Sequence, residues 1–257
     1  MTFRQYHHPR VVRIVVESPD SRDLPAKHPP EPTVMTTPLT EHCAGPLASA
    51  RHVCLGVSPF NSYFSVERIV ELARWAMASF EDYHFFIPDR AAAFTLEALG
   101  YDPARARGKA RRQGQYVVNK VCRALVDLGV HHPERHVLDG ATLAENPCYQ
   151  RLLMNAHDLF EQDETFAGHC LDATRWVLDR KLPDGEVPSE AQLRSAVRYF
   201  LAELPLFVDT PAIVGVSGSV FAYHQRVKFL ELLYARELPW QPHPGQGFVL
   251  LRPDEEC

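Results

Sequence analysis

Long apolar runs, paired cysteines and phosphate-binding loops are all missing from this chain of 257 residues. No stretch of about 18 consecutive apolar residues occurs, so the sequence predicts no membrane-spanning helix. The first residues lack the apolar core and cleavage site of a secretory signal. We therefore expect a cytoplasmic protein without a membrane partner, and the length allows one large domain or two small ones.

The six cysteines form no C-x-x-C pair, and none has zinc-ligand spacing to a histidine. This pattern predicts neither a zinc site nor a disulfide framework. The dinucleotide fingerprint G-x-G-x-x-G and the ATP loop G-x-x-x-x-G-K-[ST] are also absent. We therefore expect no metal, no cofactor and no use of ATP.

The net charge of −5 conceals a strong contrast along the chain. Residues 102–124 contain seven basic residues and one acidic residue, which gives this segment a charge of +6 and the remainder −11. Most of the basic residues are three or four positions apart, a spacing that places them in one stripe along a helix. A solvated helix face is the alternative, but a stripe of one sign favours binding to nucleic-acid phosphates. The basic stripe comprises Arg105, Arg107, Lys109, Arg111, Arg112, Lys120 and Arg123.

Proline divides the chain into two parts. Residues 1–48 hold eight of the 21 prolines, and only residues 11–16 have the composition of a strand. We interpret 1–48 as a flexible extension, because proline lacks a backbone donor and disfavours helix at the residue before it. Residues 49–257 then form a single domain.

Short apolar runs alternate with amphipathic segments from residue 52 onward. Because such alternation is typical of a parallel sheet covered on both faces, the sequence predicts an α/β, Rossmann-like domain with a mainly parallel sheet flanked by helices. The expected strands are 53–57, 84–88, 136–138, 212–216, 220–223 and 248–251. The first expected helix begins at residue 66, with Ser65 as its cap. Further helices are expected at 91–99, 103–128, 146–162, 164–181, 189–207 and 226–236.

The segment from Gly56 to Ser65 follows the first of these strands and precedes the first helix. Ligands of open α/β sheets bind beyond the carboxyl ends of the strands, so Ser58 is a candidate nucleophile, and Gly56 allows a ligand to approach the backbone. An ordinary polar turn is the alternative. A serine-hydrolase elbow requires G-x-S-x-G, and Phe60 replaces its second glycine, which argues against that class.

Two further motifs supply polar side chains. Tyr199 and Glu203 are four residues apart on an expected helix that Pro205 would close, so they share a face and are able to hold an ammonium group and move its proton. Tyr223 and His224 follow an expected strand and reach the same rim as Ser58. A solvated glutamate and a structural histidine are the alternatives.

Taken together, these features resemble the cyclodipeptide synthases, from about residue 52 to residue 253. The motifs that carry the resemblance are Gly56-Val57-Ser58 with Asn61 to Ser65, Tyr199 to Glu203 with Pro205-Leu206-Phe207, and Tyr223-His224. The trio Asn61, Tyr223 and His224 is similar to the family's Asn-Tyr-His subgroup. The resemblance implies a fold like that of class Ic aminoacyl-tRNA synthetase catalytic domains. It also implies two aminoacyl-tRNAs as partners and no need for ATP, and we expect a monomer.

The resemblance further implies a ping-pong reaction that forms a 2,5-diketopiperazine through an aminoacyl-Ser58 and a dipeptidyl enzyme. Tyr199 and Glu203 would hold the ammonium group, Glu203 and Tyr223 would move protons, and Gly56, Asn61 and His224 would shape the site. A first pocket would take the side chain of the first amino acid, for which we expect an aromatic residue and tryptophan above all. It would involve Cys54, Gly56, Phe86, Gly140, Leu206 and Phe221. A second pocket would involve Ala173, Trp176, Arg180 and Gln225. A serine hydrolase and a non-catalytic tRNA-binding module remain the alternatives.

Overall fold

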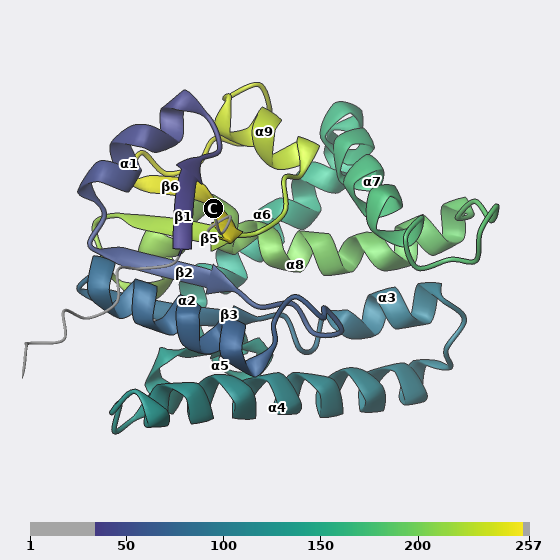
Figure 1. Ribbon diagram of the computed structural model, residues 1–257. Coiled ribbons are helices and arrows are strands. Elements are labelled where there is room, and N and C mark those ends of the chain that lie inside the picture. The colour runs from purple at the N-terminus through teal and green to yellow at the C-terminus, as the bar shows by residue number, and fades with distance from the viewer. Residues whose placement is uncertain (1–33, 254–257) are drawn as a thin grey trace, which may run out of the picture. The chain divides into compact units, whose positions relative to one another are not determined.

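The computed structural model describes residues 34–253, which form a six-stranded sheet flanked by helices (Figure 1). The strand order is β1-β6-β5-β2-β3-β4; β1 pairs antiparallel with β6, and the other four pairings are parallel. The strands are β1 (Val34–Pro38), β2 (His52–Gly56), β3 (Asp82–Ile87), β4 (Val137–Asp139), β5 (Ser219–Tyr223) and β6 (Gln246–Pro253). This architecture confirms the predicted α/β class with a mainly parallel sheet.

Nine α-helices occur within residues 34–253, and two short 3-10 turns accompany them, η1 (Glu41–Cys43) and η2 (Pro133–His136). The helices are α1 (Ala44–Ser49), α2 (Val66–Ser79), α3 (Ala92–Ala98), α4 (Pro103–Asp127), α5 (Gly140–Ala144), α6 (Pro147–Gln162), α7 (Glu164–Leu178), α8 (Glu190–Val214) and α9 (Lys228–Tyr234). The Ser65 hydroxyl accepts a hydrogen bond from the Arg68 amide, which confirms the predicted cap of α2.

Strand residues alternate between two apolar layers, one on each face of the sheet. Val53 and Leu55 of β2 pack with α2 and α4, whereas Cys54 packs with α8 and the helices around it. All three side chains are fully buried, because helices cover both faces. This explains why the strands are continuous apolar runs rather than alternating polar ones.

Helix α4 contains Gly114 at a position where its neighbour leaves no room for a side chain. A Cβ atom on Gly114 would lie 2.2 Å from the Cβ of Asp89, which follows β3. Asp89 in turn accepts a hydrogen bond of 2.7 Å from the Gly140 amide. The glycine thus sets how closely α4 approaches the end of β3, despite its low helix propensity.

Residues 34–48, which the sequence places in the flexible extension, belong to the folded part of the chain together with residue 49. They form β1, η1 and α1, and β1 pairs with the last strand, Val34 opposite Pro253 and Pro38 opposite Val249. Pro38 stands at the end of this edge strand, where its missing amide costs no internal ladder bond. The expected strand at 11–16 lies outside the described residues.

The predicted strand at 212–216 is wrong, because residues 212–214 belong to α8 and the last two follow its end. The helix is interrupted at Asp209, whose side chain accepts a hydrogen bond of 3.0 Å from the Ala212 amide and so caps the segment after it. Gly215, with a φ of 78°, then ends the helix. Pro205 does not close the helix as predicted either, because α8 continues past it to Val214. The proline is buried with its neighbours in the core.

Three of the five cysteines in the described part of the chain are buried, and none of the five is in a disulfide. The buried ones, Cys43, Cys54 and Cys170, pack as small apolar side chains. Within residues 34–253, no helix combines the length and the apolar character needed to cross a membrane.

Substitution of the two glycines of α4 tests the packing argument. Gly114→Ala forces Asp89 away and should destabilise the protein by about 1–3 kcal/mol. Gly108→Ala is the matched control, because its Cβ would meet only Arg112 Nη1, at an ordinary 3.6 Å. That variant should gain about 0.5–1 kcal/mol from helix propensity. Urea unfolding measures both values, and shifts of the same sign would contradict the argument.

Candidate active site

The parallel pairing of β2 with β5 brings Ser58 beside Tyr223. Leu55 of β2 pairs with Ala222 of β5, so the residues that follow leave the sheet at the same edge. The Ser58 hydroxyl oxygen lies 3.0 Å from the Tyr223 hydroxyl oxygen, within hydrogen-bond distance. Two residues far apart in the sequence thus meet at the carboxyl edge, where ligands of α/β sheets bind.

Gly56 makes this contact possible by leaving space for two aromatic rings. A Cβ atom there would lie 2.9 Å from the ring of Phe221 and 3.2 Å from Cδ2 of Tyr223. The sequence predicts close approach of a ligand at Gly56, but in the structure these side chains fill the space. A side chain at position 56 would push Tyr223 away from Ser58.

Helix α8 adds Tyr199 and Glu203 to the group around Ser58. Burial raises the pKa of the Tyr199 hydroxyl well above its usual value, and hydrogen bonding to Ser58 opposes this shift. Burial raises the pKa of the Glu203 carboxyl to about 8, and hydrogen bonding with Tyr199 opposes it. Glu203 is therefore mostly a neutral acid near pH 7, and an adjacent cation would convert it to the carboxylate.

The loop after Ser58 fixes His224 as a neutral ring. Asn61 accepts a hydrogen bond of 3.0 Å from the Tyr63 amide, so its Nδ2 faces His224 Nε2, 3.4 Å away, and donates to it. Tyr63 stacks on the imidazole at 3.8 Å between centroids. Burial lowers the pKa of His224 to about 4, so the ring carries no charge at neutral pH. Its buried Nδ1 has no hydrogen-bond partner among the described residues.

Phe60 adopts a left-handed backbone conformation, with a φ of 63°, and its ring is 38% exposed. This is the conformation that a glycine at this position would favour, so the loop keeps a local strain of about 1–3 kcal/mol. The Lys109 ammonium of α4 lies 5.8 Å from the centre of the Phe60 ring.

Two lysines of the basic stripe contact the active-site loop and its surroundings. Lys109 donates a hydrogen bond of 2.8 Å to the Tyr101 hydroxyl, and Lys120 donates one of 3.2 Å to the Phe64 carbonyl. Both side chains are partly buried. The sequence predicts phosphate contacts for them, whereas in the structure they join α4 to neighbouring backbone and side chains.

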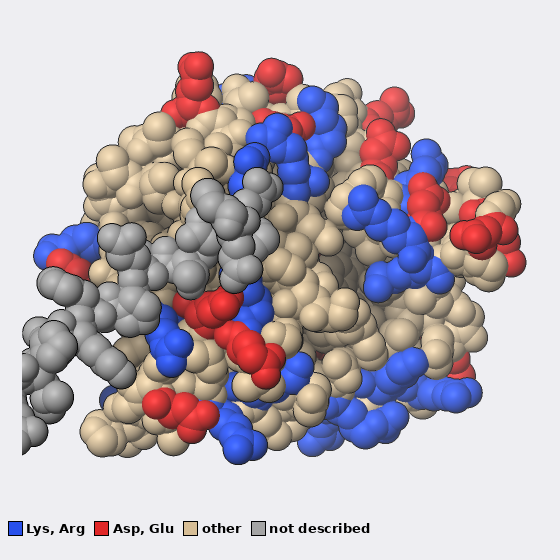
Figure 2. Space-filling view, viewed as in Figure 1, with Lys and Arg blue, Asp and Glu red and all other residues tan. Residues whose placement is uncertain are grey.

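The other members of the basic stripe are exposed arginines. Figure 2 shows Lys and Arg side chains gathered at the lower right, over the first half of α4. Within the described residues the stripe forms one long ion pair, between Arg107 and Glu97 at 4.0 Å. Val117, Val121 and Leu125 are buried, so α4 has an apolar face toward the sheet and a basic face toward solvent. The exposed arginines are Arg105, Arg107, Arg111, Arg112 and Arg123.

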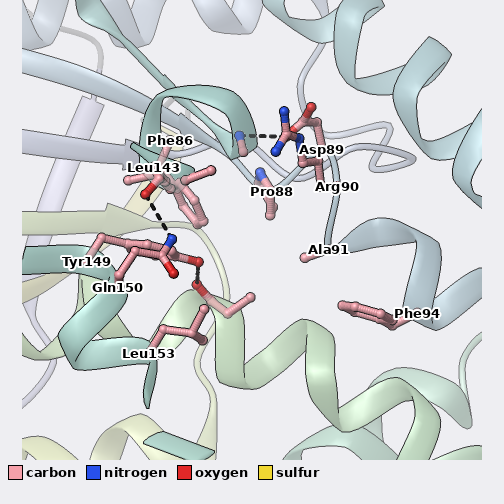
Figure 3. Close-up of a pocket in the computed structure, with 13 residues that line it drawn as sticks. Phe86, Pro88, Asp89, Arg90, Ala91, Phe94, Leu143, Tyr149, Gln150 and Leu153 are labelled. Atoms are coloured by element: carbon pink, nitrogen blue, oxygen red, sulfur yellow. Dashed lines mark hydrogen bonds between the residues drawn. The ribbon is translucent and has the colours of Figure 1, made fainter. Parts of the chain in front are cut away.

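A cavity of about 230 Å³ lies between the end of β3 and the middle of α8 (Figure 3). Phe86 and Gly140, both predicted for a first pocket, line it. Burial and the nearby Glu203 carboxyl raise the pKa of the phenol of Tyr149, which lines the cavity; the cavity therefore adjoins the polar group around Ser58. The predicted residues Cys54, Leu206 and Phe221 do not line the cavity; they are buried in the apolar layer that also contains Phe86.

Most residues that line this cavity are not among those predicted from the sequence. Tyr149 of α6 donates a hydrogen bond of 2.9 Å to the Ala202 carbonyl, and Phe94 of α3 lies across the cavity from α6 in Figure 3. Asp89 also lines the cavity, and its carboxylate accepts the hydrogen bond from the Gly140 amide. No short motif marks these residues, because they come from helices that meet only in the folded chain.

A second cavity, of about 340 Å³, lies between α7 and the start of α9. Ala173 and Trp176, predicted for a second pocket, line it together with Arg226. Arg180 does not line it but stacks on Trp176, with its guanidinium carbon 3.5 Å from the ring centre. Gln225 also stays outside the lining and precedes Arg226.

Comparison with known proteins gives consistent similarities. A family profile described as cyclodipeptide synthase matches residues 34–253. The chain is 31% identical to cyclo(L-tyrosyl-L-tyrosyl) synthase of Mycobacterium tuberculosis, covering 92% of this chain and 83% of that protein. It is 33% identical to cyclo(L-leucyl-L-leucyl) synthase of Bacillus subtilis, covering 83% and 87%.

Solved structures agree with the sequence comparisons. A cyclodipeptide synthase from Bacillus thermoamylovorans aligns with a TM-score of 0.79 at 29% identity, covering 86% of this chain and 96% of that one. A Mycobacterium tuberculosis protein described as relating cyclodipeptide synthetases to type I tRNA synthetases aligns with a TM-score of 0.76 at 31% identity, covering 87% and 94%.

The raised pKa of Glu203 predicts a pH-dependent stability cost. The unfolded carboxyl loses its proton near pH 4.5 and the folded one near pH 8, so stability falls as pH rises through this window. Glu203→Gln is neutral at every pH, so it should be more stable than the wild type at about pH 9, by a few kcal/mol, and similar at about pH 4. Thermal unfolding at both pH values measures the difference.

Glu67→Gln is the control for this comparison. Glu67 is exposed, and hydrogen bonding within the first turn of α2 lowers the pKa of its carboxyl. Its substitution should bring no gain in stability at about pH 9. A gain for Glu203→Gln of equal size at both pH values would contradict the assigned pKa.

Proposed function

Because the chain belongs to the cyclodipeptide synthase family, we propose that it uses Ser58 to join two amino acids, each delivered as an aminoacyl-tRNA, into a 2,5-diketopiperazine. The observation that carries this proposal is the convergence of Ser58, Tyr199, Glu203 and Tyr223 at one edge of the sheet. These groups offer a nucleophile, a site for an ammonium group and proton carriers in one place.

The reaction begins with attack of the Ser58 hydroxyl on the ester carbonyl of the first aminoacyl-tRNA. The acyl group moves to Ser58, and the terminal ribose oxygen of the tRNA leaves with a proton. The Tyr223 hydroxyl oxygen lies 3.0 Å from the Ser58 hydroxyl oxygen, and this distance supports a role for Tyr223 in passing the proton. Burial raises the pKa of Tyr223 to about 12, which keeps its phenol protonated and able to donate.

Glu203 and Tyr199 hold the amino group of the bound residue. The carboxyl of Glu203 has a pKa of about 8, close to that of an α-amino group, so a proton passes between the two at little cost. This match favours Glu203 as the group that frees the amine for attack. Tyr199 stays neutral and donates its hydroxyl proton to Glu203, which leaves the phenol oxygen able to accept a hydrogen bond from the amino group.

Three acyl transfers then complete the cycle in a ping-pong order. The amine of the second aminoacyl-tRNA attacks the Ser58 ester, which gives a dipeptide that is still esterified to its tRNA and restores the Ser58 hydroxyl. Return of that dipeptide to Ser58 gives the dipeptidyl enzyme and frees the second tRNA. Attack of the free amine on the ester carbonyl then closes the ring and releases Ser58. A serine hydrolase is less well supported, because His224 faces Asn61 rather than Ser58.

The first cavity favours a large aromatic residue, and tryptophan above all. Its walls combine aromatic rings with small residues that leave room, among them Gly140, Ala144 and Ala202. Tyr149 of the cavity wall lies near Glu203, which supports a side chain in this cavity when Glu203 holds the amino group. The relative from Mycobacterium tuberculosis, named for two tyrosines, supports an aromatic choice for this chain as well.

Expression in a bacterium tests the reaction and the product together. Mass spectrometry of the medium should detect diketopiperazines that contain an aromatic residue, with tryptophan products the most abundant. Ser58→Ala should abolish the products and the acyl-enzyme, since it removes the nucleophile. Products from the Ser58→Ala variant would remove Ser58 from the mechanism, and purely aliphatic products would overturn the aromatic assignment.

We also propose that the exposed arginines of α4 bind the phosphates of the tRNA acceptor stem without reading its sequence. Changing Arg105, Arg111 and Arg112 to Gln should raise KM for aminoacyl-tRNA about tenfold or more and leave kcat nearly unchanged. The dependence of log affinity on log salt should become shallower by about 2–3.

A second triple variant provides the control for charge alone. Arg74, Arg151 and Arg236 are exposed arginines outside the stripe, and their change to Gln removes the same charge. This variant should keep the KM and the salt dependence of the wild type. Equal effects of the two triples would mean that net charge, and not the stripe, governs tRNA use.

A further inference from the structure

A row of polar side chains crosses the sheet at the edge opposite Ser58. His52 begins β2 and pairs in register with Asp82, the first residue of β3. His84 is two residues further along β3 and so points to the same face as Asp82. The six residues of chain from His52 to Ser58 span about 20 Å when extended, which separates this row from the active site.

Three side chains of this row bring ligand atoms together. One ring nitrogen of His52, one of His84 and one carboxylate oxygen of Asp82 all lie within 4.8 Å of one another. His52 Nε2 and His84 Nδ1 are 2.8 Å apart. His52 is buried at 1% exposure, whereas His84 and Asp82 are partly exposed, so the cluster has a path to solvent.

Neighbouring groups hold the two rings in place from outside the cluster. His52 Nδ1 lies 2.7 Å from the hydroxyl of Ser219 in β5, which is able to accept its proton. With the proton on Nδ1, the lone pair of His52 Nε2 faces His84 Nδ1. Hydrogen bonding to the backbone of Arg135 also acts on His84. Partners of this kind, on the nitrogen that does not bind the metal, are typical of metal-ligating histidines.

We propose that His52, His84 and Asp82 bind one divalent transition-metal ion, with zinc as the first choice, at the amino edge of the sheet. Two imidazoles and a carboxylate are a common ligand set for zinc. Zinc–nitrogen bonds of about 2.0–2.1 Å at a tetrahedral angle place the nitrogens about 3.3 Å apart, so the rings open by a few tenths of an ångström. The ion joins β2 to β3, and a water molecule completes the coordination.

Zinc titration of the tag-free full chain tests the site. After chelation and dialysis, zinc chloride should raise the melting temperature of the wild type, and elemental analysis should find one zinc per chain. His84→Ala and Asp82→Ala should lose both effects, while Ser219→Ala should bind about tenfold more weakly. All three variants should retain diketopiperazine synthesis, which shows that they fold.

His132→Ala provides the control for binding at surface histidines. His132 is exposed and lies outside the cluster, so this variant should respond to zinc as the wild type does. Visible absorption of the cobalt-substituted protein gives an independent readout, since tetrahedral nitrogen and oxygen ligation colours the ion. Absence of stoichiometric zinc in the wild type, or equal zinc content in His84→Ala, would overturn the proposal.

Discussion

The parallel pairing of β2 with β5 is the contact on which the rest of the site depends. These strands are neighbours in space although about 165 positions separate them in the chain, and no local turn fixes their register. The register sets Ser58 against Tyr223 and leaves Gly56 beside the ring of Phe221. A shift by one residue would turn every side chain of β2 to the other face and separate the two hydroxyls.

An apolar layer between the two polar edges gives the active site its chemistry. Cys54, Phe86 and Phe221 occupy the middle of the same sheet face, with Ser58 beyond one end and His52 at the other. This layer removes water from beneath the helix that carries Glu203, and burial raises the pKa of that carboxyl. The protein thus keeps a buried acid at a cost in stability, at the position where we propose that proton transfer occurs.

The sequence predicts the central strands and the polar motifs well, because periodicity, caps and short motifs are local. Prediction from the sequence fails where contacts between residues far apart in the chain decide the local structure. The apolar run at 212–216 is typical of a strand, yet the Asp209 cap and the buried surroundings make it helical. Residues 34–38 include the β-branched Val34, Thr36 and Thr37, but they lie among prolines, and their pairing with the edge of β6 decides that they form a strand.

The candidate site shows the same division. Ser58, Glu203 and Tyr223 carry recognisable motifs, and the roles that the resemblance implies for them stay predictions for experiment. Spacing alone places Lys109 and Lys120 in the basic stripe, but it does not reveal that their ammonium groups have partners in Tyr101 and the Phe64 carbonyl. Likewise, Tyr149 and Phe94 reach the cavity only because α6 and α3 lie on either side of it.

The two lysine contacts make α4 a mechanical link as well as a charged surface. One rigid helix of 25 residues carries the exposed arginines on its outer side and, through Lys120, supports the backbone of the loop that bears Ser58. Displacement of Lys120 would therefore act on the loop that bears the nucleophile, whereas changes confined to the outer arginines leave this support in place. The two faces of α4 are thus open to separate change, the outer one in its charge and the inner one in its contact with the loop.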